Sequence, residues 1–285
     1  MRPGDGQTTY GADTRERVGF FTDTTICIGC KACEVACKEW NDVPEDGLLW
    51  TGNSFDNTRE LDANTWRHVA FVEQRKELGP PQEANLDAAD RGPMDFRWLM
   101  ESDVCKHCTH AGCLDVCPTG AITRTEFGTV VIQDDVCNGC GYCVTACPFG
   151  VITLRELGGD GGAHKCTLCY DRIRDGFEPA CAKACPTQSI QYGPLAELRE
   201  RAHARLSALR EEGVEDARLY LADEGDGIGG AGAFFLLLDE PQVYGLPPDP
   251  VVPTRHLGEI WGAAAVAAVG LLAGTALAAI TGRSR

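Results

Sequence analysis

Basic residues are scarce in this chain of 285 residues. It has 42 Asp and Glu residues against 26 Lys and Arg residues, which gives a formal net charge of −16. Binding of nucleic acid needs a basic face that neutralises phosphates. The charge balance therefore argues against a nucleic acid partner.

Motifs for nucleotide binding and for common catalytic chemistry are also lacking. The sequence has no Walker loop, no dinucleotide-binding fingerprint and no nucleophile elbow. No set of residues combines a nucleophile with a base or forms an open metal position. We therefore expect the chain to have no catalytic site of its own, and a free-standing membrane-bound enzyme is poorly supported.

Cysteine is abundant, and all sixteen cysteines fall into four tight groups. Four sets of four thiolates match the ligand count of four [4Fe–4S] clusters. Zinc ribbons use two separated pairs for each metal, and disulfide scaffolds do not pack cysteines so tightly in fours. The pattern therefore predicts iron bound through all sixteen cysteines rather than zinc or disulfides. The groups are Cys27, Cys30, Cys33 and Cys37 (one); Cys105, Cys108, Cys113 and Cys117 (two); Cys137, Cys140, Cys143 and Cys147 (three); and Cys166, Cys169, Cys181 and Cys185 (four).

The spacing within the groups indicates how clusters share cysteines. Groups one and three read C-x2-C-x2-C-x3-C, so the fourth cysteine follows the third by about one helical turn. In two-cluster ferredoxins the fourth cysteine of such a run binds the neighbouring cluster, and proline usually follows it. Pro118, Pro148 and Pro186 follow the fourth cysteines of groups two, three and four, whereas Lys38 follows that of group one. Longer spacers in groups two and four alter the loops but not the ligand count.

Paired groups are expected to exchange their fourth cysteines. Groups two and three are adjacent and should pair, and groups one and four then pair around them. A full set of cysteines in every group also predicts four cubanes and no three-iron cluster. The expected ligand sets are Cys27, Cys30, Cys33 and Cys185 (set A); Cys166, Cys169, Cys181 and Cys37 (set B); Cys105, Cys108, Cys113 and Cys147 (set C); and Cys137, Cys140, Cys143 and Cys117 (set D).

The segments between the groups predict an α+β fold. Ala121 to Thr125 and Thr129 to Gln133 are typical of two short strands around a turn at Gly128, and similar strand entries follow Cys147 and Cys185. We expect two nested ferredoxin-like two-cluster units with a long insertion and a single C-terminal transmembrane helix. The predicted divisions are 1–38 with 164–193 (outer unit), 39–104 (insertion and subunit contact), 105–157 (inner unit), 194–257 (amphipathic helix and C-terminal extension) and 258–282 (transmembrane helix).

The insertion holds four of the five tryptophans of the chain, and Trp66 to Gln74 has strand character. Large aromatic side chains are frequent both in subunit interfaces and in cores. The tryptophans therefore predict either a partner surface or a cover over the clusters, and the sequence leaves both open. Further along, 194–213 predicts an amphipathic helix with an apolar stripe of leucines, ending at Gly213. The tryptophans are Trp40, Trp50, Trp66 and Trp98.

Five lysines lie beside cysteines of the groups. Positive charge near a cluster offsets its negative charge and raises its reduction potential. The alternative is that these are ordinary solvated lysines, and the sequence does not decide between the two. The lysines are Lys31, Lys38, Lys106, Lys165 and Lys183.

The C-terminal segment predicts a membrane span. From Ile260 to Ile280 the chain has 21 residues, of which only Thr275 is polar. At about 1.5 Å per residue this is roughly 31 Å, close to the thickness of a hydrocarbon core of about 30 Å. Trp261 stands at one end, where interfacial aromatics occur. We favour a span over the alternative of a buried, Ala-rich soluble helix.

The orientation of this span follows from charge. Arg283 and Arg285 follow it, and Arg255 precedes it, so the positive-inside rule places the C-terminus in the cytoplasm and the cluster domain outside. Residues 1–21 contain no apolar export segment and no twin arginine, so we expect export on a partner's signal. The alternative is a tail anchor with the cluster domain in the cytoplasm.

The cysteine-bearing stretches carry a resemblance that covers nearly the whole chain. They resemble the iron–sulfur beta subunit of respiratory formate dehydrogenase of the N/O type, and the similarity departs at the N-terminus and in 212–232. The matching stretches are CIGCKACEVACKEWND, DVCKHCTHAGCLDVCPTGAI, DDVCNGCGYCVTACPFGVI, AHKCTLCYDRI, PACAKACPTQSIQYG, RHVAFVEQ and VYGLPPDP.

The resemblance implies a role and partners. In that family a large catalytic subunit oxidises formate at a molybdenum or tungsten bis-pterin centre, and the beta subunit relays the electrons through four [4Fe–4S] clusters. A membrane cytochrome b subunit then receives them and reduces quinone, and the beta subunit faces outside after export on the catalytic subunit's twin-arginine signal. The alternative is an electron-transfer subunit of another molybdopterin oxidoreductase or of a membrane-bound hydrogenase. The catalytic partner distinguishes these, because the chemistry of the chain is the same.

Overall fold

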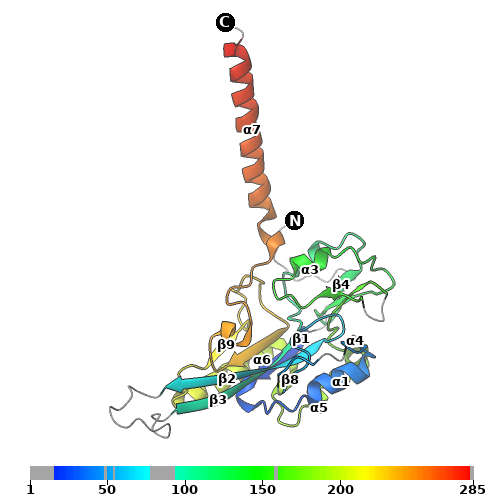
Figure 1. Cartoon of the computed structure of the whole chain (residues 1–285), viewed down its shortest axis with the longest axis vertical. Coiled ribbons are helices and arrows are strands. Elements are labelled where there is room, and N and C mark those ends of the chain that lie inside the picture. The colour runs from blue at the N-terminus through cyan, green and yellow to red at the C-terminus, as the bar shows by residue number, and fades with distance from the viewer. Residues whose placement is uncertain (1–15, 48–49, 54, 78–93, 157–159, 283–285) are drawn as a thin grey trace.

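The computed structural model describes residues 16–47, 50–53, 55–77, 94–156 and 160–282. A stalk-like helix, α7 (Leu257–Gly282), stands on a body that carries all four cysteine groups (Figure 1). The predicted α+β class with a single C-terminal apolar helix is confirmed. Most of the N-terminal stretch that we expect to lack an export signal, up to residue 15, lies outside the described residues, as do Arg283 and Arg285.

A four-stranded sheet forms the centre of the body. Its order is β8-β1-β10-β9, and β1 runs parallel to β10 and antiparallel to β8. Phe20 and Phe21 of β1 are both fully buried, as expected for a central strand that is covered on both faces. Each such side chain contributes about 1.5–3 kcal/mol when it leaves water. The strands are β1 (Val18–Asp23), β8 (Ile190–Pro194), β9 (Arg218–Tyr220) and β10 (Ala233–Leu237).

The close approach of β1 and β10 depends on a glycine. A Cβ atom on Gly19 would lie 2.0 Å from the backbone oxygen of Gly232, which no side chain tolerates. The sheet joins three distant parts of the chain, because β9 and β10 belong to the C-terminal extension. The predicted outer unit and the extension therefore share one sheet, which sequence reasoning did not anticipate.

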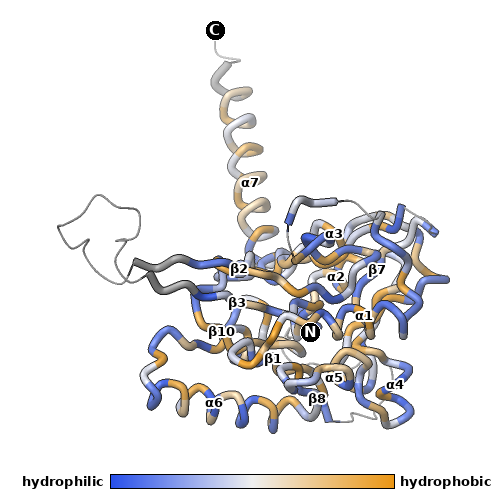
Figure 2. The backbone as a smooth tube through the Cα atoms, turned by 60° about the horizontal axis from the view of Figure 1, so that its bottom comes forward, coloured by the Kyte–Doolittle hydropathy of each residue, from blue (hydrophilic) through white to orange (hydrophobic). Residues whose placement is uncertain are grey.

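Helix α6 (Leu195–Glu211) packs against β1 and β8. Leu195, Leu198 and Leu209 are buried on one face, while the opposite face is hydrophilic in Figure 2. The predicted amphipathic helix is thus confirmed, and Gly213 follows it in the left-handed conformation that often ends helices.

The insertion contains a long hairpin, the inner unit contains a short one, and a second short one joins the inner unit to the segment before group four. The predicted strand in WRHVAFVEQ is confirmed as part of β2, and the two strands around Gly128 are confirmed as β4 and β5. All three hairpins are antiparallel. Their strands are β2 (Arg67–Glu77) with β3 (Met94–Val104), β4 (Ile122–Arg124) with β5 (Val130–Ile132), and β6 (Thr153–Leu154) with β7 (Ala163–His164).

Short helices accompany the cysteine groups. α1 and α5 pack against each other at the end of the body far from α7, whereas α2 and α3 contact each other at the base of α7 (Figure 1). The cysteine groups are therefore distributed along the length of the body. The remaining helices are α1 (Ala32–Trp40), α2 (Gly112–Asp115), α3 (Tyr142–Ala146), α4 (Tyr170–Arg174) and α5 (Ala180–Ala184), with 3-10 turns η1 (Thr24–Ile26), η2 (Pro241–Tyr244) and η3 (Pro253–His256).

Within the described residues, one segment is long and apolar enough to cross a membrane, Pro253–Ala279. Its residues are not buried against the body. The 26 residues of α7 span about 39 Å at 1.5 Å per residue, which exceeds a hydrocarbon core of about 30 Å. The alternative of a buried soluble helix does not fit this exposed position in the isolated chain.

Candidate iron–sulfur cluster sites

All four cysteine loops share one backbone feature. The residue directly before the second cysteine is left-handed in each, with φ of 64° at Gly29, 44° at His107, 69° at Gly139 and 58° at Leu168. This conformation costs a residue with a side chain roughly 1–2 kcal/mol. His107 and Leu168 are fully buried, so packing around them offsets that cost. Residue type alone did not reveal the repeat, because only two of the four positions are glycine.

Short helices carry the fourth cysteines away from their loops. Cys37 lies on α1, one turn beyond Cys33. Cys147 and Cys185 directly follow α3 and α5 as their C-terminal caps. The chain thus leaves each loop in a helical turn, as the C-x3-C spacing predicts, and places the fourth thiol beside another group.

Set A surrounds a cavity at the end of the body far from α7. All four of its cysteines line this cavity, together with Val69 and Ser102 from the insertion hairpin. Burial, with smaller contributions from the nearby Cys33 and Cys185, raises the pKa of Cys27 to about 11. The structure therefore brings Cys185 of group four beside the loop of group one.

Set D surrounds a second cavity, next to α3. Its lining includes Cys117, Cys137, Cys140 and Cys143. Burial raises the pKa of Cys143 to about 11, with further contributions from the other three cysteines. The amide of Ala163 lies 3.4 Å from Cys137 Sγ, a position from which it stabilises negative charge on sulfur.

Sets B and C lie deeper in the body. Burial raises the pKa of Cys37 well above its ordinary value, and the thiols that add to this shift are those of Cys166, Cys181 and Cys169. Asn41 Nδ2 lies 3.7 Å from Cys37 Sγ and 3.8 Å from Cys169 Sγ, and so touches both halves of set B.

Set C shows the same arrangement around Cys108. Burial raises the pKa of this thiol, and Cys105, Cys113 and Cys147 raise it further. In sets A, B and C, and around Cys143 of set D, buried thiols are crowded together where thiolates are costly unless a cation compensates them. Cys117 of set D differs, because hydrogen bonds from the backbone at Ile122 and from Thr119 lower the pKa of this more exposed thiol. Binding of iron supplies that compensation and releases the thiol protons. The donor set and its crowding fit a thiolate-bound iron–sulfur cluster.

Neighbouring sets also influence each other. The charge of Cys181 in set B acts on Cys33 in set A, and that of Cys105 in set C acts on Cys166 in set B. Set C in turn meets set D, because Cys143 acts on Cys113, whose pKa burial raises to about 12. The four thiol sets therefore follow one another in the order A, B, C, D.

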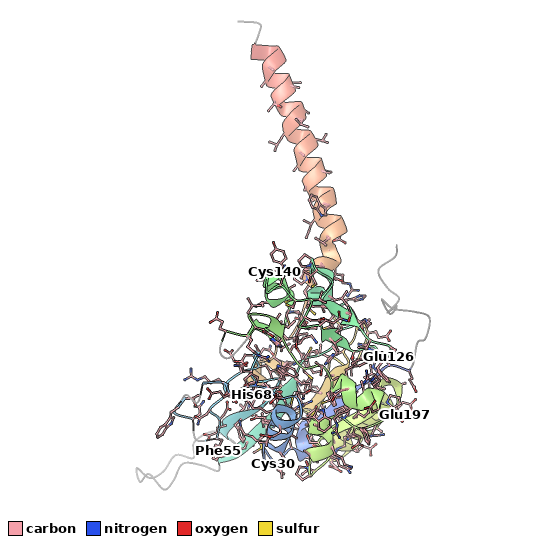
Figure 3. All side chains as sticks on the ribbon, turned by 90° about the vertical axis from the view of Figure 1, so that its right-hand side faces the viewer. Cys30, Phe55, His68, Glu126, Cys140 and Glu197 are labelled. Atoms are coloured by element: carbon pink, nitrogen blue, oxygen red, sulfur yellow. The ribbon has the colours of Figure 1, made fainter. Side chains whose placement is uncertain are left out.

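The two ends of this row differ from its middle. Cys30 in set A and Cys140 in set D are exposed, whereas Cys166 and Cys105 in the inner sets are buried. In Figure 3, Cys140 lies close to the base of α7 and Cys30 lies at the opposite end of the body. The turn η3 that precedes α7 is tied to the body, because Thr254 Oγ1 donates a hydrogen bond of 2.5 Å to Asp115 Oδ2 of α2, the helix that carries Cys113 of set C.

Buried cations lie along the row. Of the five lysines expected to offset cluster charge, Lys106 and Lys165 are fully buried, whereas Lys183 is exposed. Arg67 was missed by sequence reasoning, although it is almost completely buried. Arg67 lies two residues before the buried Val69 in the same strand, so the two side chains are on one face of it. This alternation is the sequence signal that could have predicted a buried Arg67.

The tryptophans of the insertion differ in their exposure. Trp66 is half-buried and packs against the core, whereas Trp50 is 87% exposed and Trp40 is 49% exposed. The hairpin also lines the cavity of set A through Val69 and Ser102. The hairpin therefore contributes to the cover over set A, and the partner surface stays a prediction.

Comparisons with known proteins decide the family. Two matches to a 4Fe-4S dicluster domain cover residues 26–121 and 96–195. The nitrate-inducible formate dehydrogenase iron–sulfur subunit of Escherichia coli is 39% identical over 85% of this chain and 76% of that protein. The formate dehydrogenase iron–sulfur subunit of Haemophilus influenzae is 38% identical over 84% of this chain and 72% of that protein.

The chain belongs to the family of formate dehydrogenase iron–sulfur subunits. A related protein, the B subunit of the anaerobic dimethyl sulfoxide reductase of Escherichia coli, is 35% identical over 67% of this chain and 80% of that protein. As a formate dehydrogenase iron–sulfur subunit with two dicluster domains and sixteen cysteines, the chain holds four [4Fe–4S] clusters and transfers electrons. It works with a catalytic partner subunit.

Proposed function

We propose that this chain relays electrons within a membrane-bound formate dehydrogenase complex. The donor is a large catalytic subunit with a molybdenum or tungsten bis-pterin centre, and the acceptor is a membrane cytochrome b subunit that reduces quinone. Oxidation of formate to carbon dioxide releases two electrons and one proton. Reduction of a quinone to a quinol takes up two electrons and two protons, so two single-electron passages serve each turnover.

The observation that carries this proposal is the row of thiol sets that ends beside α7. We assign one cluster to each of sets A, B, C and D, as the shared cavities and crowded thiols support. A bound [4Fe–4S] cluster accepts and donates one electron. The fold of the chain holds the four sets in a row. Sets B and C are buried, and this burial keeps water away from their clusters.

The two exposed ends of the row suggest where electrons enter and leave. Cys30 marks the end far from the membrane helix, where we place the contact with the catalytic subunit. The exposed Trp50 belongs to the insertion that lines set A, and so fits the same contact. Cys140 marks the end at α7, where we place the cytochrome b subunit.

The orientation in the membrane completes the proposal. We place α7 across the lipid bilayer with the C-terminus in the cytoplasm and the cluster domain outside, in agreement with the arginines after the span. Export would then occur together with the catalytic subunit. Under the alternative, with the cluster domain in the cytoplasm, an externally added protease would not reach the body in intact cells.

A second candidate is an electron-transfer subunit of another molybdopterin oxidoreductase, in which electrons run the other way. The similarity to the B subunit of dimethyl sulfoxide reductase supports this second candidate. A membrane-bound hydrogenase is the further alternative, and it would use hydrogen as the donor. These candidates differ in the partner at the set A end, and they are separated by the substrate that changes the redox state of the clusters.

The test is anaerobic purification of the complex from native membranes, followed by electron paramagnetic resonance spectroscopy. We expect a large pterin-binding subunit to co-purify and formate to reduce the clusters. Reduction by hydrogen but not by formate would support the hydrogenase. Oxidation of pre-reduced clusters by dimethyl sulfoxide, without any response to formate, would contradict the formate dehydrogenase assignment.

A further inference from the structure

Arg67 lies at the junction between sets A and B. Its guanidinium is buried, and the charges acting on it most strongly after burial come from Cys181, Cys33, Cys166 and Cys37. Cys33 belongs to set A, and the other three belong to set B. The hydroxyl of Ser102, which accepts a hydrogen bond from Arg67 Nη1, lies 3.3 Å from Cys33 Sγ of set A. The guanidinium is therefore a positive charge that faces two cluster sites.

The hydrogen bonds of Arg67 leave much of its charge available. Nη1 donates to Ser102 O at 3.1 Å and to Ser102 Oγ at 3.0 Å, and the guanidinium lies 4.9 Å from the centre of the Phe20 ring. Nε and Nη2 have no hydrogen-bond partner among the described residues. These two nitrogens carry three N–H bonds, which have no oxygen or nitrogen acceptor in the described part of the chain and face thiols, with Cys181 near enough to interact with the guanidinium.

Lys165 occupies the next junction, between sets B and C. Its side chain is buried, and Nζ donates to the backbone oxygens of Val130 and, at 3.1 Å, Cys166. The charges acting on it after burial come from Cys105 and Cys113 of set C and Cys166 of set B. Its position relative to sets B and C is equivalent to that of Arg67 relative to sets A and B.

Neither cation is neutralised by a paired carboxylate. Within the described residues no ion pair joins Arg67 or Lys165 to an acid, whereas Lys106 is paired with Asp103. Glu101 lies near Arg67, but burial raises the pKa of its carboxyl well above the ordinary range, which favours the neutral form. Both positive charges therefore act on the thiol sets with little cancellation.

We propose that Arg67 and Lys165 are tuning residues, each of which raises the reduction potentials of the two clusters on either side of it. Reduction adds one negative charge to a cluster, and burial disfavours this charge. A buried cation at close range opposes that effect, because the Coulomb interaction is strong where water is excluded. Set B faces both cations, set A faces only Arg67, set C faces only Lys165, and set D faces neither.

The consequence for electron transfer is that the reduction potentials of the inner clusters are brought closer to those of the outer clusters. Without these cations, the deepest clusters would be the hardest to reduce, and the two exposed ends would be separated by a barrier. The inference rests on the proposed assignment of one cluster to each set. It does not rest on formate as the donor, because potentials are measured with chemical mediators.

The test is a mediated redox titration of the intact complex, followed by electron paramagnetic resonance, in the Arg67→Gln, Lys165→Gln and double variants. Each single variant should move two of the four midpoint potentials to more negative values, and the two variants should have one moved potential in common. The double variant should move three, with the common one shifted most. This pattern requires no prior assignment of signals to sites.

Controls separate charge from structure. Iron is counted first, and sixteen irons per chain show that no cluster was lost. Arg67→Lys and Lys165→Arg keep the charge, so they should leave all four potentials close to those of the wild type. Arg210→Met removes an exposed guanidinium and should shift none. If a glutamine variant loses iron, Arg67→Met or Lys165→Met removes the charge without adding an unsatisfied amide.

Several results would overturn the proposal. One is that no potential moves, another is that all four move together. A third is that the two variants have both moved potentials in common, or none. A fourth is that Arg67→Lys shifts the potentials as far as Arg67→Gln does, because the residue would then act by holding Ser102 rather than by its charge. A complex that fails to respond to formate but shows the expected pattern would contradict only the proposed donor.

Discussion

Trp40 Nε1 donates a hydrogen bond of 2.8 Å to Asp171 Oδ2 and so joins α1 to α4. Arg172 lies over the same indole, 4.1 Å from its centre. Cys37 is on α1, and Cys169 directly precedes α4. These contacts therefore connect two segments that both supply thiols to set B, although 131 positions separate the tryptophan from the aspartate.

Replacing Trp40 with Phe should loosen set B. The change removes the hydrogen bond and weakens the stacking of Arg172, with an expected loss of about 1 kcal/mol. Iron should then leave the purified complex faster in the presence of a chelator, and the signal of one cluster should decay first. Trp50→Phe is the matched control, because Trp50 is 87% exposed and should have no effect. Equal rates in the two variants would show that the contact does not hold the site.

The cysteine pattern could be read from sequence because ligand spacing is local. A C-x2-C-x2-C loop and the turn that follows it are set by neighbouring residues, and the C-x3-C step fixes where the fourth thiol points. The same holds for α6 and α7, whose leucine stripe and apolar run are local signals. For these reasons the predicted strands around Gly128, the amphipathic helix and the apolar span were all confirmed.

The central sheet could not be read in the same way. β10 is a continuous apolar run, AFFLL, and such a run fits several partners equally well. Its parallel pairing with β1, with Phe21 opposite Phe234, joins residues more than two hundred positions apart. Arg67 was missed for a related reason: its neighbours come from four other segments, and a lone arginine in a strand is usually solvated.

Two glycines close in sequence to cysteines of group three, Gly139 and Gly150, separate the effect of backbone conformation from the effect of available space. Gly139 and Gly150 both have positive φ, of 69° and 65°. A Cβ atom on Gly139 would lie 2.5 Å from Gly161 O, whereas one on Gly150 would meet no atom within 4 Å. Gly150→Ala should cost about 1 kcal/mol from the conformation alone, and Gly139→Ala clearly more. The loss of stability in each variant is measured by the temperature at which the cluster absorbance disappears. A larger loss of stability in Gly150→Ala than in Gly139→Ala would contradict the structure.

Glu101 should make the stability of the folded chain depend on pH. Burial, and next the charge of Asp103, raise the pKa of its carboxyl well above the ordinary value. The folded chain then keeps a proton that the unfolded chain releases above about pH 4.3, so stability falls as pH rises from there towards the folded pKa. Each tenfold change in proton affinity is worth about 1.4 kcal/mol.

Glu101→Gln should remove this dependence. The variant should differ least from the wild type near pH 5 and resist denaturant-induced cluster loss increasingly better towards pH 8, because its side chain has no proton to lose. Glu197→Gln is the control, since Glu197 is exposed on α6. A stability difference between variant and wild type that stays constant over this range would argue against a buried, protonated Glu101.

Single Cys→Ser variants test how the cysteines are divided among clusters. Cys37 lies four residues after Cys33 on α1, yet the thiols that act on it are those of Cys166, Cys181 and Cys169. Serine is a weaker ligand than a thiolate, so each variant should convert or lose one cluster. Cys37→Ser and Cys181→Ser should alter the same one of the four paramagnetic signals, whereas Cys33→Ser and Cys185→Ser should alter a different one. If Cys37→Ser instead alters the signal that Cys33→Ser alters, each group binds its own cluster and the nested arrangement is wrong.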